Sequence, residues 1–137
     1  MFNEVDHLED PVVPVIHAHA APVHELPGTR FTSLATPTTA DATDTAVWLV
    51  EIAPGTPATP HTLTREEVFV VLDGRAAVRL GGVEAEAGPS DAVLVPAGVA
   101  FEIEPAGPDP VRMVCCLPVG GRARLADGTV LTPPWSE

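Results

Sequence analysis

The sequence contains no Lys and no Tyr, and only seven of its 137 residues are basic, all of them Arg. Nineteen residues are acidic, so the formal net charge is -12 at pH 7 with His neutral. A chain with this charge repels phosphate backbones and anionic membrane surfaces. Neither nucleic acid nor a membrane is therefore expected as a partner.

Long apolar runs and cysteine pairs are also missing. No run approaches the roughly 18 apolar residues that a transmembrane helix needs, and residues 1–10 lack the positive stretch of a signal peptide. The two cysteines, Cys115 and Cys116, are adjacent. Neighbouring side chains on a strand point to opposite faces, so a disulfide between them is geometrically poor. These features predict a cytoplasmic protein.

Proline and glycine are abundant instead, with 16 Pro and 11 Gly. A hydrophobic share of 45% argues against disorder, and the length fits one domain. Three regions of the chain differ in composition and in the structure that we expect. Residues 1–27 form an acidic, extended N-terminal arm that contains Pro and His, residues 28–118 form a β-barrel, and residues 119–137 form a C-terminal hairpin and tail.

Short β-rich segments fill the middle region and are separated by turn signals. Asp73-Gly74 stands between two such segments and predicts a hairpin, and Gly81-Gly82 and Asp127-Gly128 predict two further turns. Short strands with turns every roughly 8–12 residues are typical of a sandwich or barrel. The pattern therefore predicts an all-β, antiparallel domain. The segments are 45–52, 67–72, 75–80, 83–86, 92–95, 101–104 and 111–117.

Two motifs resemble those of the cupin superfamily. Residues 55–74, GTPATPHTLTREEVFVVLDG, match the first motif at Gly55, His61, Glu67 and Gly74, but Leu63 occupies its second His position. Residues 88–101, GPSDAVLVPAGVAF, resemble the second motif. They match it at Gly88, Pro96 and Gly98, whereas Phe101 occupies its closing His position. The resemblance implies a double-stranded β-helix, or jelly-roll barrel, with a pocket at its open end.

The resemblance also implies a degenerate metal site. Typical cupins hold a divalent metal through three His and one Glu, at positions that here are His61, Leu63, Glu67 and Phe101. Catalytic metals usually need at least three protein ligands. No tightly bound metal or other cofactor is therefore expected, and the alternative is a weakly held divalent metal.

Four further side chains are candidates to complete such a site. They are His17, His19 and His24 of the N-terminal arm, and Cys115. The simpler interpretation is that the histidines lie on the surface and that Cys115 packs in the pocket, because free Cys is usually a buried small residue.

Strand alternation predicts which side chains line the barrel. If one register runs from His61 through the turn at Thr64-Arg65, then His61 and Glu67 share a face, and His61 is the nearest partner for a buried Glu67. This pair is the candidate catalytic site. The predicted ligand pocket comprises Trp48, Leu63, Phe69, Phe101, Met113 and Cys115.

Three functions fit these features. The first is a non-enzymatic cupin that binds a small apolar or aromatic metabolite. The second is an isomerase, cyclase or dehydratase in which His61 and Glu67 transfer protons. The third is a weakly metal-dependent, dioxygenase-like cupin. A homodimer is also expected, because exposed sheet edges and an extended arm favour pairing of subunits.

Overall fold

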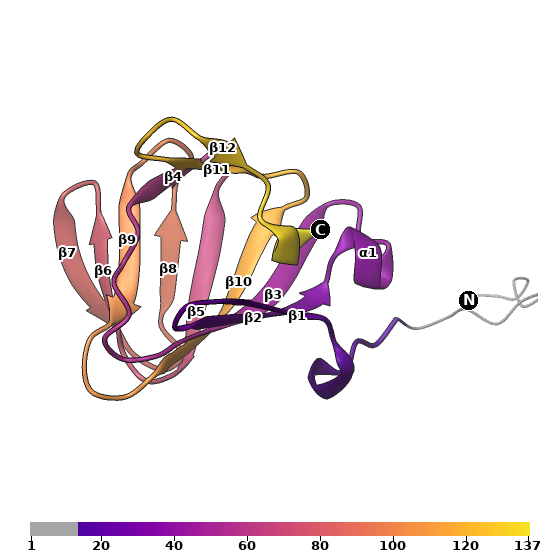
Figure 1. The fold of residues 1–137 in the computed structure, drawn as a ribbon, viewed down its shortest axis with the longest axis horizontal. Coiled ribbons are helices and arrows are strands. Elements are labelled where there is room, and N and C mark those ends of the chain that lie inside the picture. Colours follow the sequence, from indigo (N-terminus) through magenta and orange to yellow (C-terminus); the bar gives the residue numbers. More distant parts are fainter. Residues whose placement is uncertain (1–13) are drawn as a thin grey trace, which may run out of the picture.

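The computed structural model describes residues 14–137, and these form two six-stranded antiparallel sheets that face each other (Figure 1). The all-β jelly-roll prediction is confirmed. The first sheet has the order β1 (Val23–Leu26), β2 (Thr29–Ala35), β3 (Thr45–Ile52), β10 (Val111–Pro118), β5 (Glu67–Asp73) and β8 (Ala92–Val95). The second has the order β12 (Val130–Leu131), β11 (Ala123–Leu125), β4 (His61–Leu63), β9 (Phe101–Pro105), β6 (Ala76–Leu80) and β7 (Val83–Ala87).

Three short helical turns complete the described chain. They are the 3-10 helices η2 (Ala18–Ala20) and η3 (Pro134–Ser136), and the single-turn helix α1 (Pro37–Ala40). Thr36 caps α1, because its side chain accepts a hydrogen bond from the backbone N–H of Thr39. No helix within residues 14–137 is long and apolar enough to cross a membrane.

The central strands form because their β-branched and aromatic residues alternate between the core and the outside. Strand β10 alternates strictly, with its odd-numbered residues from Val111 to Leu117 buried. Strand β3 buries Ala46, Trp48 and Val50. The core therefore lies between the sheets, as the alternation predicts.

The predicted hairpin at Asp73-Gly74 is wrong. Strand β5 pairs with β10 and β8, whereas β6 pairs with β7 and β9. Gly74, with a φ of 78°, is thus the corner at which the chain passes from the first sheet to the second. A Cβ atom there would overlap the backbone carbonyl oxygen of Pro110. The other two predicted turns are present, between β6 and β7 and between β11 and β12.

Both ends of the described chain join the sheets. Val23–Leu26, inside the segment expected as an arm, forms the edge strand β1. The C-terminal strands β11 and β12 lie across one end of the barrel (Figure 1). Ser33 Oγ donates to the Trp135 carbonyl at 2.9 Å, and the Thr38 N–H donates to the Glu137 carbonyl at 2.9 Å. These bonds fix the C-terminal segment against β2 and α1.

Candidate functional site

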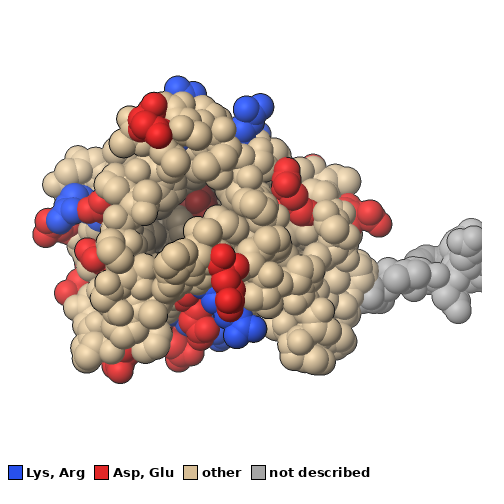
Figure 2. Space-filling view, in the orientation of Figure 1, with Lys and Arg blue, Asp and Glu red and all other residues tan. Residues whose placement is uncertain are grey.

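A cavity of about 400 Å³ lies between the two sheets. Figure 2 shows a hollow with a mostly uncharged rim on the viewed face of the molecule. Among the lining residues Glu67 is the only acid and His61 the only histidine, and most of the others are aliphatic or aromatic. Apolar concavities with a few polar groups are the usual form of small-molecule sites.

The structure brings all eight sequence-predicted site residues to this cavity. They lie on five strands: β3, β4, β5, β9 and β10. Period-two alternation aims them inward, because the intervening residues of the same strands face outward. The eight are Trp48, His61, Leu63, Glu67, Phe69, Phe101, Met113 and Cys115.

Glu67 is the first residue of β5 and is only 4% exposed. Burial raises the pKa of its carboxyl group from 4.5 to about 8, because the low-dielectric surroundings disfavour the charged form. Among residues 14–137, no side chain forms a hydrogen bond or ion pair with this carboxyl group. Glu67 is therefore mostly protonated at neutral pH and can donate a hydrogen bond into the cavity.

His61 lies at the start of β4, in the sheet opposite Glu67. The prediction that the two residues share one strand face is wrong, because the chain changes sheets between β4 and β5. The expected His61–Glu67 pair is also not formed. His61 Nδ1 instead donates to the Thr59 carbonyl oxygen at 2.8 Å, which leaves Nε2 as the nitrogen free to bind a ligand.

Aromatic rings form two groups on the cavity walls. In one, the Phe101 ring contacts the His61 ring at a centroid distance of 4.4 Å and the Phe69 ring at 5.8 Å. In the other, the rings of Phe31 and Trp135 stack with centroids 3.6 Å apart and planes 4° apart. The cavity thus offers flat apolar surfaces from both sheets and from η3.

Sequence reasoning missed the second aromatic group. Phe31 could have been found, because β2 alternates and buries Phe31 and Ser33. Trp135 had no such signal, since it lies in a Pro-rich tail whose position depends on a hydrogen bond to Ser33, 102 residues away. Leu131 and Pro133 of the same tail also line the cavity.

Cys115 lines the cavity and Cys116 faces outward, as alternation predicts. Burial, and to a lesser degree the nearby Glu67, raise the pKa of the Cys115 thiol well above its usual value. The thiolate is the nucleophilic form of cysteine, so the neutral Cys115 thiol acts as a packing residue in this cavity.

The residues present do not fit a resident metal ion. Of the four cupin ligand positions, Leu63 and Phe101 are buried apolar side chains that cannot ligate. His17, His19 and His24 do not reach the cavity, because they lie on η2 and β1 or beside them. Among residues 14–137 no group of three His, Cys, Asp or Glu side chains could hold a metal. His61 and Glu67 alone do not make the three-ligand site of a catalytic metal.

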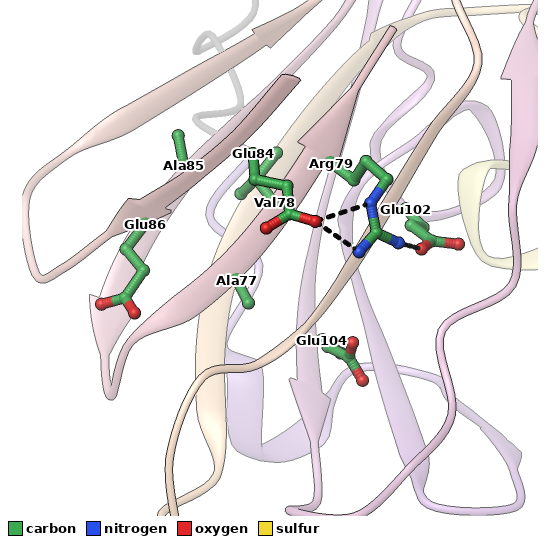
Figure 3. Close-up of a pocket in the computed structure, with 8 residues that line it drawn as sticks. All are labelled: Ala77, Val78, Arg79, Glu84, Ala85, Glu86, Glu102 and Glu104. Atoms are coloured by element: carbon green, nitrogen blue, oxygen red, sulfur yellow. Dashed lines mark hydrogen bonds and ion pairs between the residues drawn. The ribbon is translucent and has the colours of Figure 1, made fainter. Parts of the chain in front are cut away.

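A second hollow of about 310 Å³ lies on the outer face of β6, β7 and β9 (Figure 3). Arg79 extends between Glu84 and Glu102 and forms ion pairs with both, at 2.7 Å between Arg79 Nη2 and Glu84 Oε2. Glu86 and Glu104 also line this hollow. The Arg79 and Glu84 side chains are at least half exposed, so this hollow is a solvated charged surface.

Two antiparallel sheets closed around one apolar cavity define a single-domain jelly-roll barrel. The chain belongs to the cupin family, because the family model described as "Cupin domain" matches residues 48–117. A comparison with curated proteins finds no match.

Several solved structures share the fold. The polyketide cyclase RemF from Streptomyces resistomycificus matches with a TM-score of 0.75 and 19% identity, covering 84% of this chain and 86% of its own. KdgF from Halomonas sp. matches with a TM-score of 0.66 and 21% identity, covering 78% and 94%. An RmlC-like cupin from Shewanella frigidimarina matches with a TM-score of 0.67 and 14% identity, covering 78% and 91%. At these identities the likeness establishes the fold alone.

Proposed function

We propose that this cupin binds a small, flat, largely apolar molecule inside its barrel, with the Glu67 carboxyl group as the main polar anchor. The observation that carries the proposal is a single carboxyl group, 4% exposed and without a partner among the described residues, that lines an apolar cavity of about 400 Å³. A buried polar group without a partner is costly, and a ligand that supplies the partner recovers that cost.

The chemistry of the walls defines the ligand further. Protonated Glu67 donates a hydrogen bond, so the matching ligand group is a neutral acceptor such as a carbonyl oxygen. The two aromatic groups, Phe69 with Phe101 and Phe31 with Trp135, favour an aromatic ligand, because aromatic pairs attract beyond their buried area.

A pair of matched probes tests this assignment. 1-Tetralone is a bicyclic aromatic ketone, and tetralin is the same ring system without the carbonyl group. We expect calorimetric titration at pH 6 to show tighter binding of 1-tetralone by about tenfold, the value of one hydrogen bond of about 1.4 kcal/mol. The preference should disappear above pH 8, where ionised Glu67 no longer donates.

Two substitutions of Glu67 separate the hydrogen bond from the shape of the cavity. Glu67→Gln keeps a donor that does not titrate, so it should keep the ketone preference at every pH. Glu67→Leu should bind both probes equally. The proposal fails if Glu67→Leu retains the preference or if neither probe binds the wild-type protein.

A filled cavity provides an independent check. Ala123 is 7% exposed and lines the cavity, so Ala123→Phe should block both probes. Ala77 lines the outer hollow, and Ala77→Phe is the matched control that should leave binding unchanged. Unchanged binding in Ala123→Phe would locate the probes outside the barrel.

Proton-transfer catalysis is the second candidate function. The specific observation in its favour is the Glu67 pKa of about 8, because a general acid or base works best with a pKa near the working pH. A structural relative that is a polyketide cyclase also makes carbonyl substrates a reasonable class to test. Ionised Glu67 would take a proton from the carbon next to a carbonyl group and return one to the resulting enolate.

Hydrogen exchange on the same ketone distinguishes catalysis from binding. In D₂O, a catalytic Glu67 should speed the loss of the 1-tetralone C2 proton signal in NMR spectra, and more so as pH rises toward 8. Glu67→Gln should abolish the acceleration while it still binds. Binding without acceleration would leave the protein a binding module.

A further inference from the structure

His61 lines the same cavity as Glu67, and two contacts hold its ring in place. Its Nδ1 atom lies 2.8 Å from the carbonyl oxygen of Thr59, and its ring contacts the Phe101 ring at a centroid distance of 4.4 Å. Phe101 is directly opposite His61 in the register of β9 and β4, and it is only 4% exposed. The imidazole ring therefore has a fixed position in the cavity wall before any ligand binds.

The contact with Thr59 determines which ring nitrogen carries the proton. A carbonyl oxygen only accepts hydrogen bonds, so Nδ1 is the N–H nitrogen of His61. In the neutral imidazole, Nε2 then carries a lone pair and can only accept. Among residues 14–137 no group donates a hydrogen bond to this nitrogen. The ring thus presents an unused acceptor.

The acceptor of His61 and the donor of Glu67 come from opposite sheets. His61 begins β4 of the second sheet, and Glu67 begins β5 of the first. Sheets that pack face to face lie about 10 Å apart, so both side chains can reach one small ligand. The Phe101 ring joins the two walls, because it contacts His61 on its own sheet and Phe69, the next inward residue after Glu67, on the other. A flat ligand packed against Phe101 is therefore within reach of both polar groups.

The hydroxyl groups of the cavity do not select a ligand in the same way. Thr29, Thr56 and Thr59 also line it. A hydroxyl group both donates and accepts, so a threonine does not distinguish a donor on the ligand from an acceptor. Thr56 Oγ1 in addition donates to the Gly28 carbonyl oxygen at 3.4 Å. In contrast, the neutral His61 ring can only accept at Nε2.

We propose that His61 Nε2 is a second polar anchor that selects ligands with a hydroxyl group, so that the ligand class is a hydroxyaryl ketone. The hydroxyl group of the ligand donates to Nε2, and its carbonyl oxygen accepts from Glu67. This inference rests on the proposed function, because it takes the contact between Glu67 and the carbonyl group as given. A ligand that cuts Nε2 off from water without supplying a donor binds less tightly, because an unpaired acceptor costs free energy.

Three pairs of probes measure the hydroxyl contact in the wild-type protein. They are 5-, 6- and 7-hydroxy-1-tetralone, each with its methyl ether, which cannot donate a hydrogen bond. The three isomers place the hydroxyl group at different distances from the carbonyl group and so sample the gap between the two anchors. At pH 7 we expect calorimetric titration to show about tenfold tighter binding of at least one hydroxy ketone than of its methyl ether, the value of one hydrogen bond.

Substitutions of His61 separate hydrogen bonding from packing. His61→Phe keeps a flat ring against Phe101 but has no acceptor, so it should bind the hydroxy ketone and its methyl ether equally. His61→Gln retains an acceptor oxygen and should keep the preference. His19→Phe is the matched control and should also keep it, because His19 is exposed on η2 and lies outside the cavity.

Nitrogen-15 NMR spectra of the wild-type protein detect the same contact without a substitution. We expect Nδ1 of His61 to appear as a protonated nitrogen and Nε2 as an unprotonated one, as the contact with Thr59 requires. The preferred hydroxy ketone should shift the Nε2 signal more than its methyl ether does. The spectrum of His61→Gln, in which one set of imidazole signals is missing, identifies the signals of His61.

These measurements separate failure of the His61 anchor from failure of the proposed function. Equal binding of every hydroxy ketone and its methyl ether by the wild-type protein would overturn the anchor, and so would a hydroxyl preference that persists in His61→Phe. The ratio of 1-tetralone to tetralin affinity, measured in parallel, reports on Glu67. A normal ketone preference without a hydroxyl preference leaves the proposed function intact, whereas loss of the ketone preference in the wild type overturns it. If His61→Phe does not fold, as judged by its circular dichroism spectrum, the Nε2 signal decides, and equal shifts with both probes overturn the anchor.

Discussion

The two sheets of the barrel share an apolar interior but differ on their outer faces. The second sheet carries Arg79, Glu84 and Glu102 on its outer face, joined by ion pairs (Figure 3). The first sheet keeps charge to one row of its outer face and is apolar beyond it. The second sheet thus has a charged, solvated outer face, whereas part of the outer face of the first sheet lies beside Ala18 and His19 of η2.

Acidic side chains show a second contrast, between the inside and the outside of the barrel. Glu67 begins β5, points into the cavity and is 4% exposed, whereas Glu102 lies on β9 and bonds to Arg79. The chemistry of a carboxyl group thus depends on the face to which its strand position assigns it. Inside the barrel, Glu67 is a neutral hydrogen-bond donor, whereas on the outer face Glu102 accepts a hydrogen bond from Arg79 as a charged carboxylate.

The largest predicted effect is the pH dependence of stability that Glu67 causes. Its pKa is about 8 in the folded protein and 4.5 as an ordinary carboxyl group, so the folded state holds the extra proton between these values. Stability is greatest below about pH 4.5 as far as this group is concerned, and it falls as pH rises to about 8. The loss is on the order of 4–5 kcal/mol.

Urea unfolding at several pH values measures this effect. Glu67→Gln should remove most of the slope between pH 5 and 8, because the amide does not titrate. Glu102→Gln is the control from the outer face and should keep the slope of the wild-type protein. Equal slopes in Glu67→Gln and the wild type would show that burial does not hold the Glu67 proton.

The second predicted effect concerns the corner between the sheets. Gly74→Ala should reduce the free energy of unfolding by about 3 kcal/mol, because it adds strain at positive φ to an overlap with the Pro110 carbonyl group. Gly82→Ala has a similar φ of 86° but open space around the added Cβ atom, so we expect about 1 kcal/mol. Equal losses in thermal unfolding would mean that the corner adjusts to the overlap.

Much of the fold follows from local patterns in the sequence. The boundaries of β3, β5 and β10 agree with the apolar segments to within a residue or two. The charged residues Arg112 and Glu51, which are paired across β10 and β3, mark the outward phase of their strands. Alternation is enough to assign the inward and outward residues of these strands, because each strand packs against the core on one face. Glu67 is the one acid on the inward phase.

Strand partners were not predictable in the same way. Asp-Gly is the same local signal at a hairpin and at a corner, and only the pairing of β5 with β10 distinguishes the two. Likewise, the sequence allows one register to continue from His61 through the turn at Thr64-Arg65 to Glu67, although this turn joins two sheets. Trp135 depends on a contact with Ser33 across most of the chain. Such long-range choices leave no period in the sequence.

The smallest effect is expected on the charged outer face of the second sheet. Arg79→Gln removes the ion pairs to Glu84 and Glu102. These two carboxylates stabilise the charged guanidinium group and so raise the pKa of Arg79. Exposed ion pairs contribute little, because water and salt screen them and two flexible side chains must be ordered. The unfolding midpoint should therefore shift less than in Gly82→Ala, and the shift should shrink in molar salt. Probe binding should not change. A large loss that persists in salt would show instead that the Arg79 hollow has a structural role comparable to that of the interior.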